Sequence, residues 1–368
     1  MKKILFGLLF ALLLAQPAQA LSAHSAIVLD CASGDVLFAH NADEILPMAS
    51  TTKIMTALVA LDYGDLDRTY TVKKEYTLVE GSSMYLREGE TISMRDTLYG
   101  LMLMSGNDAA LAVAGECGGQ QAFVQAMNDK AAALGLMNTH FDNPNGLDSE
   151  NHHTTAHELA TLAAYAMQNP DFRQIVSTAS YTMEGRTMVN HNKLLKRYPD
   201  AIGIKTGYTK KSGRCLVSAA ERNGRQLVAV TLNDPDDWDD HIAMLDDAFS
   251  QFQEYTLHEA GQQIGSAPCE GGDITVLPYQ AESDIKISLT PAEYEALETS
   301  ITGAKFIYAP AAKGQTYGTI TYTLHGKPLA QDHLTFTQSA AMLPEKLEWW
   351  EILLQKIASL LDGLRGIL

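Results

Sequence analysis

The chain has 368 residues, of which 46% are hydrophobic and 19% are charged, and this composition fits a folded protein with room for two domains. Acidic residues outnumber basic residues by 44 to 27, which gives a formal net charge of -17. Because no basic run is present to meet phosphate groups, the sequence argues against nucleic acid as a partner.

The first 20 residues have the pattern of a secretory signal peptide. Two lysines precede an apolar stretch at positions 4–14, and small residues at positions 18–20 provide a cleavage site. The apolar stretch is shorter than the length that a transmembrane helix needs to span a bilayer. We therefore expect an exported, extracytoplasmic protein whose mature chain begins at Leu21.

Four cysteines follow the signal, and an even number in an exported protein permits disulfides. They lie far apart in the sequence, each in or beside an apolar segment, so small buried thiols are an equally good interpretation. The sequence leaves the state of Cys31, Cys117, Cys215 and Cys269 open.

Residues 21–256 predict a domain with strands at both ends and helices between them. The predicted strands cover 26–30, 36–40, 202–206, 214–220 and 226–232, and the predicted helices cover 54–61, 94–104, 108–115, 121–134, 155–168 and 241–255. Asn107 suits the N-cap of the third helix, and Thr155 with Glu158 suits a capping box. Adjacent hairpins imply an antiparallel sheet, built from both ends of the domain and flanked by helices, within an α/β (α+β) fold.

The remaining chain divides into two further parts. Residues 257–341 predict a small all-β domain, with strand-like alternation at 285–289, 305–309 and 319–324. Residues 344–368 carry apolar side chains at three- and four-residue steps, which predicts an amphipathic helix. We expect this helix to anchor the protein peripherally at the outer face of the cytoplasmic membrane, although docking on its own protein or on a partner is the alternative.

Three short motifs carry the predicted chemistry. In Ser50-Thr51-Thr52-Lys53, a serine near a helix N-terminus is followed one turn later by an amine that can act as its base. Ser105-Gly106-Asn107 places a hydroxyl and an amide on a tight turn between two helices, and Lys205-Thr206-Gly207 ends a strand. This set of motifs, in this order, is known from β-lactamases and penicillin-binding proteins.

On these residues, and on the surrounding Met104 to Ala109 and Gly203 to Thr209, the chain resembles the low-molecular-mass penicillin-binding proteins that act as D-alanyl-D-alanine carboxypeptidases. The resemblance implies a penicillin-binding-protein/β-lactamase-like catalytic domain and a serine peptidase that removes the terminal D-alanine from peptidoglycan stem peptides. It also implies covalent inhibition by β-lactam antibiotics, and it calls for neither a cofactor nor a metal.

The resemblance also implies a role for each residue. Ser50 attacks the substrate carbonyl, Lys53 accepts the Ser50 proton as a neutral amine, and Ser105 relays a proton to the leaving amine. Asn107 holds the substrate amide and the Lys53 head group. Lys205 and Thr206 bind the substrate carboxylate, Gly207 permits close approach, and the backbone N–H groups of Ser50 and Tyr208 form the oxyanion hole.

One departure from the family pattern concerns the substrate carboxylate. Some relatives place an arginine before the last helix of the catalytic domain, whereas residues 234–241 of this chain are strongly acidic. Either Lys205 and Thr206 suffice here, or Arg214 contributes from the next strand.

The sequence leaves alternatives to the main interpretation. They are a D,D-endopeptidase acting on cross-links, a β-lactamase on the same scaffold, and a non-catalytic peptidoglycan-binding protein. His152, His153 and His157 suggest a zinc site, since His153 and His157 are four residues apart. Such a site is disfavoured, because no third ligand for that pair occurs at a recognisable spacing and the predicted capping box explains the local sequence.

Overall fold

The structure is a computed structural model that describes residues 21–183, 185–344 and 349–365. The chain divides into two compact units, and the boundary in the sequence falls between Phe252 and Gln253. The signal peptide expected at 1–20 lies outside the described residues.

The first unit is built on an antiparallel sheet with the strand order β2-β1-β9-β8-β7. Its strands are β1 (Ser25–Asp30), β2 (Val36–His40), β7 (Ala201–Thr209), β8 (Gly213–Arg222) and β9 (Arg225–Leu232). The N-terminal hairpin therefore pairs with the C-terminal strands of the same unit, as the sequence predicts. The two ends of the first unit together make one sheet.

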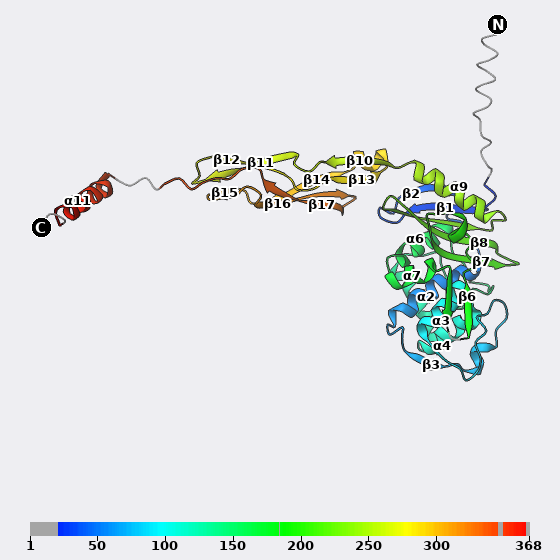
Figure 1. Ribbon diagram of the computed structural model, residues 1–368. Helices are drawn as coiled ribbons and strands as arrows, with labels where there is room; N and C mark the ends of the chain where they lie inside the picture. Colours follow the sequence, from blue (N-terminus) through cyan, green and yellow to red (C-terminus); the bar gives the residue numbers. More distant parts are fainter. Residues whose placement is uncertain (1–20, 184, 345–348, 366–368) are drawn as a thin grey trace, which may run out of the picture. The chain divides into compact units, whose positions relative to one another are not determined.

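Both faces of this sheet are covered. On β1, Ile27 and Leu29 join one hydrophobic core and Ala26 and Val28 join another, because successive strand residues point to opposite faces. Figure 1 shows α2 (Lys53–Asp62), α3 (Met94–Leu103), α4 (Asn107–Glu116), α6 (Ala156–Ala166) and α7 (Pro170–Ser177) on one side of the sheet. On the other side, α9 (Asp237–Ser250) packs through Leu245 and Ala248.

The remaining elements of the first unit are short or peripheral. They are the 3-10 turns η1 (Ala49–Thr52) and η2 (Lys74–Thr77), the strands β3 (Thr69–Thr71), β4 (Thr91–Ser93), β5 (Ser180–Met183) and β6 (Arg186–Val189), and the helices α5 (Gln120–Ala133) and α8 (Leu194–Arg197).

The sheet register directs a lysine toward the helix-covered face. Across the sheet, Ile27 lies opposite Val230, Val230 opposite Val217, and Val217 opposite Lys205. Directly opposed residues of antiparallel strands point to the same face, so Lys205 shares the face of three core side chains. This placement explains why the Lys205 side chain is buried although β7 is an edge strand.

Three local predictions need correction. Asn107 is the first residue of α4 rather than its cap, because its side chain bonds to other groups and Gly106 takes the cap position. Thr155 caps α6 by accepting from the Glu158 N–H, but the Glu158 carboxylate turns to Asn138 and Thr139 instead of completing the box. The last helix of the first unit spans Asp237–Ser250, earlier than the predicted 241–255.

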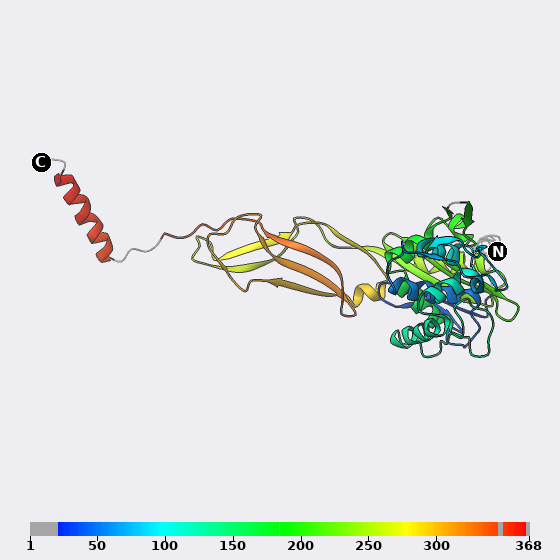
Figure 2. The same ribbon diagram turned by 90° about the horizontal axis from the view of Figure 1, so that it is seen from below.

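The second unit contains a sheet with the strand order β14-β16-β17-β12-β11-β15 and a separate pair of strands, β10 and β13. Its elements are β10 (Gln253–His258), β11 (Gln263–Glu270), β12 (Val276–Ala281), β13 (Ile285–Leu289), α10 (Pro291–Glu295), β14 (Glu298–Gly303), β15 (Ile307–Tyr308), β16 (Thr316–Leu324), β17 (Lys327–Phe336) and α11 (Trp349–Arg365). Figure 2 shows the long yellow to orange strands running side by side. The predictions at 285–289 and 319–324 are confirmed, whereas the predicted strand at 305–309 shrinks to Ile307 and Tyr308.

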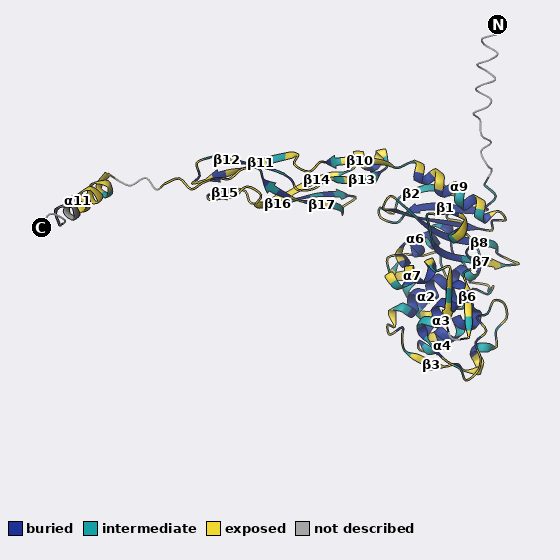
Figure 3. Cartoon of the chain, in the orientation of Figure 1, coloured by how far each residue is buried: buried dark blue, intermediate teal, exposed yellow. Residues whose placement is uncertain are grey.

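Helix α11 covers the described part of the predicted amphipathic helix; positions 345–348 and 366–368 lie outside the described residues. Its apolar side chains are exposed from Trp349 to Ile357, in contrast to the buried interior of the first unit (Figure 3). Within the described segments, no helix combines the length and apolarity needed to cross a membrane.

The four cysteines are free thiols, and three of them are buried, which resolves the choice that the sequence leaves open. Among the described residues, no group of three or more His, Cys, Asp or Glu side chains is arranged to hold a metal ion. The three histidines considered for zinc have other contacts: His157, for example, bonds to Asp43.

Candidate active site

Ser50 lies on the short 3-10 turn η1, immediately before α2. The turn is held by its own threonines, since Thr51 Oγ1 donates to the Met48 carbonyl at 2.6 Å and Thr52 Oγ1 donates to the Ala49 carbonyl at 2.8 Å. Ala49 has a positive φ of 48°, which is unusual for a residue with a β-carbon. Ser50 is half-buried at the wall of a cleft, where its hydroxyl can be reached.

Lys53 follows one turn later, and its side chain is fully buried. Its Nζ lies 3.0 Å from Ser50 Oγ and 2.7 Å from Asn107 Oδ1, and it also donates to the Asn145 carbonyl. Burial is the main cause that lowers the pKa of Lys53 well below its ordinary value, and the charge of Lys205 lowers this pKa further. The negative charge of Asp108 raises the pKa of Lys53, but by less. A neutral amine beside the serine hydroxyl can accept its proton.

Asn107 is held in place on its other side by the loop that precedes α3. Its Nδ2 donates to the Glu80 carbonyl at 2.7 Å, and its backbone N–H donates to the Ser82 carbonyl at 2.7 Å. The neighbouring Asp108 carboxylate accepts from the Met84 N–H and Leu86 N–H at 3.0 and 2.9 Å. The loop and the start of α4 therefore form one hydrogen-bonded unit around Asn107.

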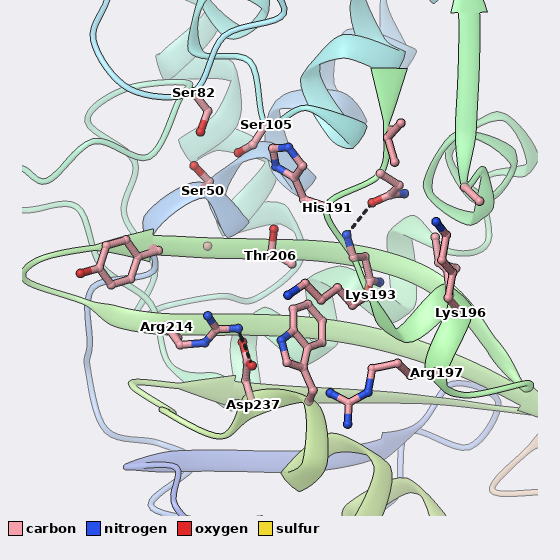
Figure 4. Close-up of a pocket in the computed structure, with 18 residues that line it drawn as sticks. Ser50, Ser82, Ser105, His191, Lys193, Lys196, Arg197, Thr206, Arg214 and Asp237 are labelled. Atoms are coloured by element: carbon pink, nitrogen blue, oxygen red, sulfur yellow. Dashed lines mark hydrogen bonds and ion pairs between the residues drawn. The ribbon is translucent and has the colours of Figure 1, made fainter. Parts of the chain in front are cut away.

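Ser105 precedes this helix on a strained turn, with a φ of 58°. It is nearly buried, and together with Ser50 it lines the cleft. Figure 4 shows the two serine hydroxyls close to each other, above Thr206 in that view. The predicted Ser105 position is thus on the same cleft wall as the predicted nucleophile.

The third motif lies across the cleft on β7. Lys205 is 1% exposed, its Nζ donates to the Thr206 carbonyl at 2.8 Å, and burial lowers its pKa to about 7. A β-carbon built at Gly207 would come within 3.2 Å of the Ser50 backbone nitrogen, so this strand and the serine turn are in close contact. Tyr208 is 66% exposed and belongs to the rim of the cleft.

Arg214 lines the same cleft from β8. Its guanidinium bonds to both carboxylate oxygens of Asp237 at 2.7 and 2.8 Å and lies 5.6 Å from the centre of the Trp238 ring. Asp237 belongs to the acidic stretch noted in the sequence, so that stretch supplies the carboxylate that holds Arg214 at the cleft (Figure 4).

The structure thus brings Ser50, Lys53, Ser105, Asn107 and the residues 205–208 together. Sequence reasoning missed two supports of the serine turn. The first is Asn145, which contacts Lys53 through a backbone carbonyl and so leaves no side-chain signal. The second is buried His152, whose Nε2 lies 2.7 Å from Thr52 Oγ1 and whose Nδ1 accepts from the Asp142 N–H.

Comparisons with known proteins agree with this geometry. Residues 13–236 match the model of the D-alanyl-D-alanine carboxypeptidase peptidase family, and residues 252–341 match the model of the penicillin-binding protein 5 C-terminal domain. The chain is 32% identical to the D-alanyl-D-alanine carboxypeptidase DacF of Bacillus subtilis, over 84% of this chain and 83% of that protein. It is 30% identical to DacA of Escherichia coli, over 86% of this chain and 83% of that protein.

Solved structures give the same result. Penicillin-binding protein 5 from Haemophilus influenzae is similar over 89% of this chain and 99% of its own, with a TM-score of 0.63 and 28% identity. The Streptomyces K15 DD-transpeptidase is similar over 63% of this chain and 98% of its own, with a TM-score of 0.61 and 33% identity. The chain therefore belongs to the D-alanyl-D-alanine carboxypeptidase family of serine peptidases.

Proposed function

We propose that this protein removes the terminal D-alanine from peptidoglycan stem pentapeptides through an acyl-enzyme on Ser50. The observation that carries the proposal is the 3.0 Å contact between Lys53 Nζ and Ser50 Oγ inside a buried site. The pKa of Lys53 is lowered there, so the amine can take the hydroxyl proton as Ser50 attacks.

The amide bond then breaks as the Ser50 ester forms. The proton held by Lys53 passes to the leaving D-alanine amine, and Ser105 is the hydroxyl on the cleft wall that can relay it. Asn107 keeps Lys53 in position through its 2.7 Å contact and orients the substrate amide. Water hydrolyses the ester in a second step and regenerates Ser50.

Substrate binding is assigned to the strand across the cleft. Lys205 supplies positive potential, and the Thr206 hydroxyl donates a hydrogen bond to the terminal carboxylate of the substrate. The backbone N–H groups of Ser50 and Tyr208 stabilise the oxyanion, a role supported by the close packing of Gly207 against the serine turn. β-Lactam antibiotics acylate the same serine, and their esters are released slowly.

The test combines a covalent label with a product assay. A labelled penicillin should modify Ser50, as located by mass spectrometry of the digested protein, and D-alanine should appear when the protein is given a stem pentapeptide. Ser50→Ala is the matched control, and it should show neither adduct nor product. An adduct on another residue, or no D-alanine from a correctly acylated protein, would overturn the assignment.

We further propose that the protein is exported and attaches to the outer face of the cytoplasmic membrane through the helix at 344–368. The support is the pattern of residues 1–20 and the exposed apolar side chains of α11, among them Trp349, Trp350 and Leu354. Deletion of 344–368 should release the protein from sedimented phospholipid vesicles, and Trp350→Glu with Leu354→Glu should weaken attachment in the full-length chain. Unchanged sedimentation of both variants would contradict the anchor.

A further inference from the structure

The cleft beside Ser50 extends well past the serine. Its volume is about 750 Å³, which is within the range of pockets that hold ligands much larger than one alanine. Ser50, Ser105 and Thr206 line one part of it, and Lys193, Lys196, Arg197 and Trp238 line a second part. A leaving D-alanine fills only a small part of this volume, so the cleft has room for a longer leaving group.

This second part of the cleft is basic. Lys193, Lys196 and Arg197, which we call the basic lobe, come from α8 and the residue before it, and in Figure 4 they lie to the right of Thr206 and below it. The chain as a whole is acidic, with 44 acidic and 27 basic residues. Three basic side chains in one wall of the cleft therefore differ in sign from the net charge of the protein.

Two of these cations have no close acidic partner. Arg197 bonds to Asp239, and the neighbouring Arg214 bonds to Asp237. Lys193 acts on Asp237 only at longer range, and neither Lys193 nor Lys196 forms a side-chain hydrogen bond or ion pair with any residue that the structure describes. The two amines thus remain available to an anion that enters the cleft.

The basic lobe lies on the side of the leaving group. In the proposed reaction the substrate carbonyl is held at Ser50 and Tyr208, and the carboxylate of the leaving residue is held at Lys205 and Thr206. Helix α8 lies at the opposite end of β7 from Tyr208, because the Ala201 N–H that begins this strand bonds to the Tyr198 carbonyl directly after α8. A leaving group longer than D-alanine would therefore continue toward the lobe.

From this placement, and resting on the proposed function, we infer that the basic lobe binds an additional carboxylate on an extended leaving group. The occupant is a leaving residue that carries a second carboxylate in its side chain. Its amide bond to the D-alanyl carbonyl breaks, the Ser50 ester forms, and the Ser50 proton ends on the leaving amine. The ester is then hydrolysed by water as in the release of D-alanine.

The inference is tested with two peptides that share one acyl part and differ in one group. One ends in D-alanyl-D-glutamate and the other in D-alanyl-D-glutamine, so the leaving residues differ only in a carboxylate and its uncharged amide. We expect kcat/KM of the full-length protein to be about fivefold to tenfold higher for the glutamate peptide at low salt. The ratio should decline as salt is added.

Replacing both free amines provides the second measurement. In the double variant Lys193→Ala with Lys196→Ala, the ratio of the two kcat/KM values should fall to about one or below. The matched control is Lys210→Ala with Lys211→Ala, which removes the same charge from exposed residues of the β7–β8 turn that do not line the cleft, and it should keep the ratio.

A ratio near one in the unmodified protein would overturn the inference, and so would a ratio that the first double variant retains or that both double variants lose equally. Penicillin labelling of Ser50 and D-alanine release are measured on the same preparations. Failure of these two assays contradicts the proposed function, whereas their success with a ratio near one contradicts the basic lobe alone.

Discussion

Gly146 lies against the backbone carbonyl of Ala49, and a β-carbon built at Gly146 would come within 2.1 Å of that oxygen. The two residues are far apart in the sequence, yet their contact fixes the turn on which Ser50 lies. Gly146 also has a φ of +86°, which a residue with a side chain rarely adopts.

Gly146→Ala should therefore displace the serine turn. We expect the rate of acylation by penicillin to fall by roughly 100-fold or more, because a shift of about 1 Å at a nucleophile can cost that much. Stopped-flow labelling measures this rate directly. The control is Gly135→Ala, at a φ of +75° but with no atom within 4 Å of the added carbon, which imposes similar backbone strain without the clash. Equal losses of rate in the two variants would show that strain, rather than the contact with Ala49, is responsible.

Lys53→Arg tests the need for a neutral amine. The guanidinium stays protonated at every accessible pH, so it cannot accept the Ser50 proton. We expect acylation to slow by about 10²–10⁴-fold, the usual contribution of a general base. Since an arginine side chain is larger than a lysine side chain and Lys53 is fully buried, Lys53→Met should be measured beside it, with circular dichroism as a check on folding.

The wild-type protein adds a pH test of the same role. Lowering the pH protonates Lys53, so the acylation rate should decline toward acid, and neither variant should show this dependence. Rapid acylation of a folded Lys53→Met protein at neutral pH would rule out Lys53 as the base.

The main sheet and the three motifs could be predicted from sequence because their signals are local. Alternating apolar strands, hairpin turns and motif residues such as Ser50 and Lys53 are visible within a few positions. Strand β14 gave no such signal, since every one of its residues is exposed and no apolar alternation marks it. The hairpin of β5 and β6 in the loop-rich region was missed for a similar reason, because only Met188 among its residues is fully buried.

Contacts made through backbone groups also could not be predicted from the sequence. The carbonyl of Asn145 and the carbonyls of Glu80 and Ser82 complete the site around Lys53 and Asn107, and any residue type provides a carbonyl. The basic lobe was missed because its three cations are ordinary surface residues by type, and only the position of α8 brings them to the cleft.

His152 should couple the stability of the protein to pH. Burial lowers its pKa to about 4 from 6.5, so between these values the unfolded chain binds more protons than the folded chain. Stability should therefore decline as the pH is lowered from 6.5 to 4. His152→Leu should remove this decline and should cost roughly 1–3 kcal/mol at pH 7, because the Asp142 N–H loses its acceptor and Thr52 loses a partner.

Urea denaturation at pH 5 and pH 7 measures both effects. His153→Leu, at the adjacent position, leaves the bonds of His152 in place and should preserve the decline. If His152→Leu also preserves it, another group must be responsible for the acid sensitivity.

Lys205 should make the protein less stable than it would be with an apolar side chain. Burial lowers its pKa to about 7 from 10.5, so the cost of the buried charge is fully present below pH 7, where both states are protonated. Between pH 7 and 10.5 the folded chain is the less protonated state, and the cost fades as the pH rises. Lys205→Met should accordingly raise the midpoint of thermal unfolding of the first unit by roughly 5 °C at pH 7. This gain should shrink toward zero near pH 10.5, while activity is lost. Exposed Lys210→Met provides the control, with no gain at either pH. A gain that stays constant with pH would mean that packing, and not the buried charge, limits stability at this position of β7.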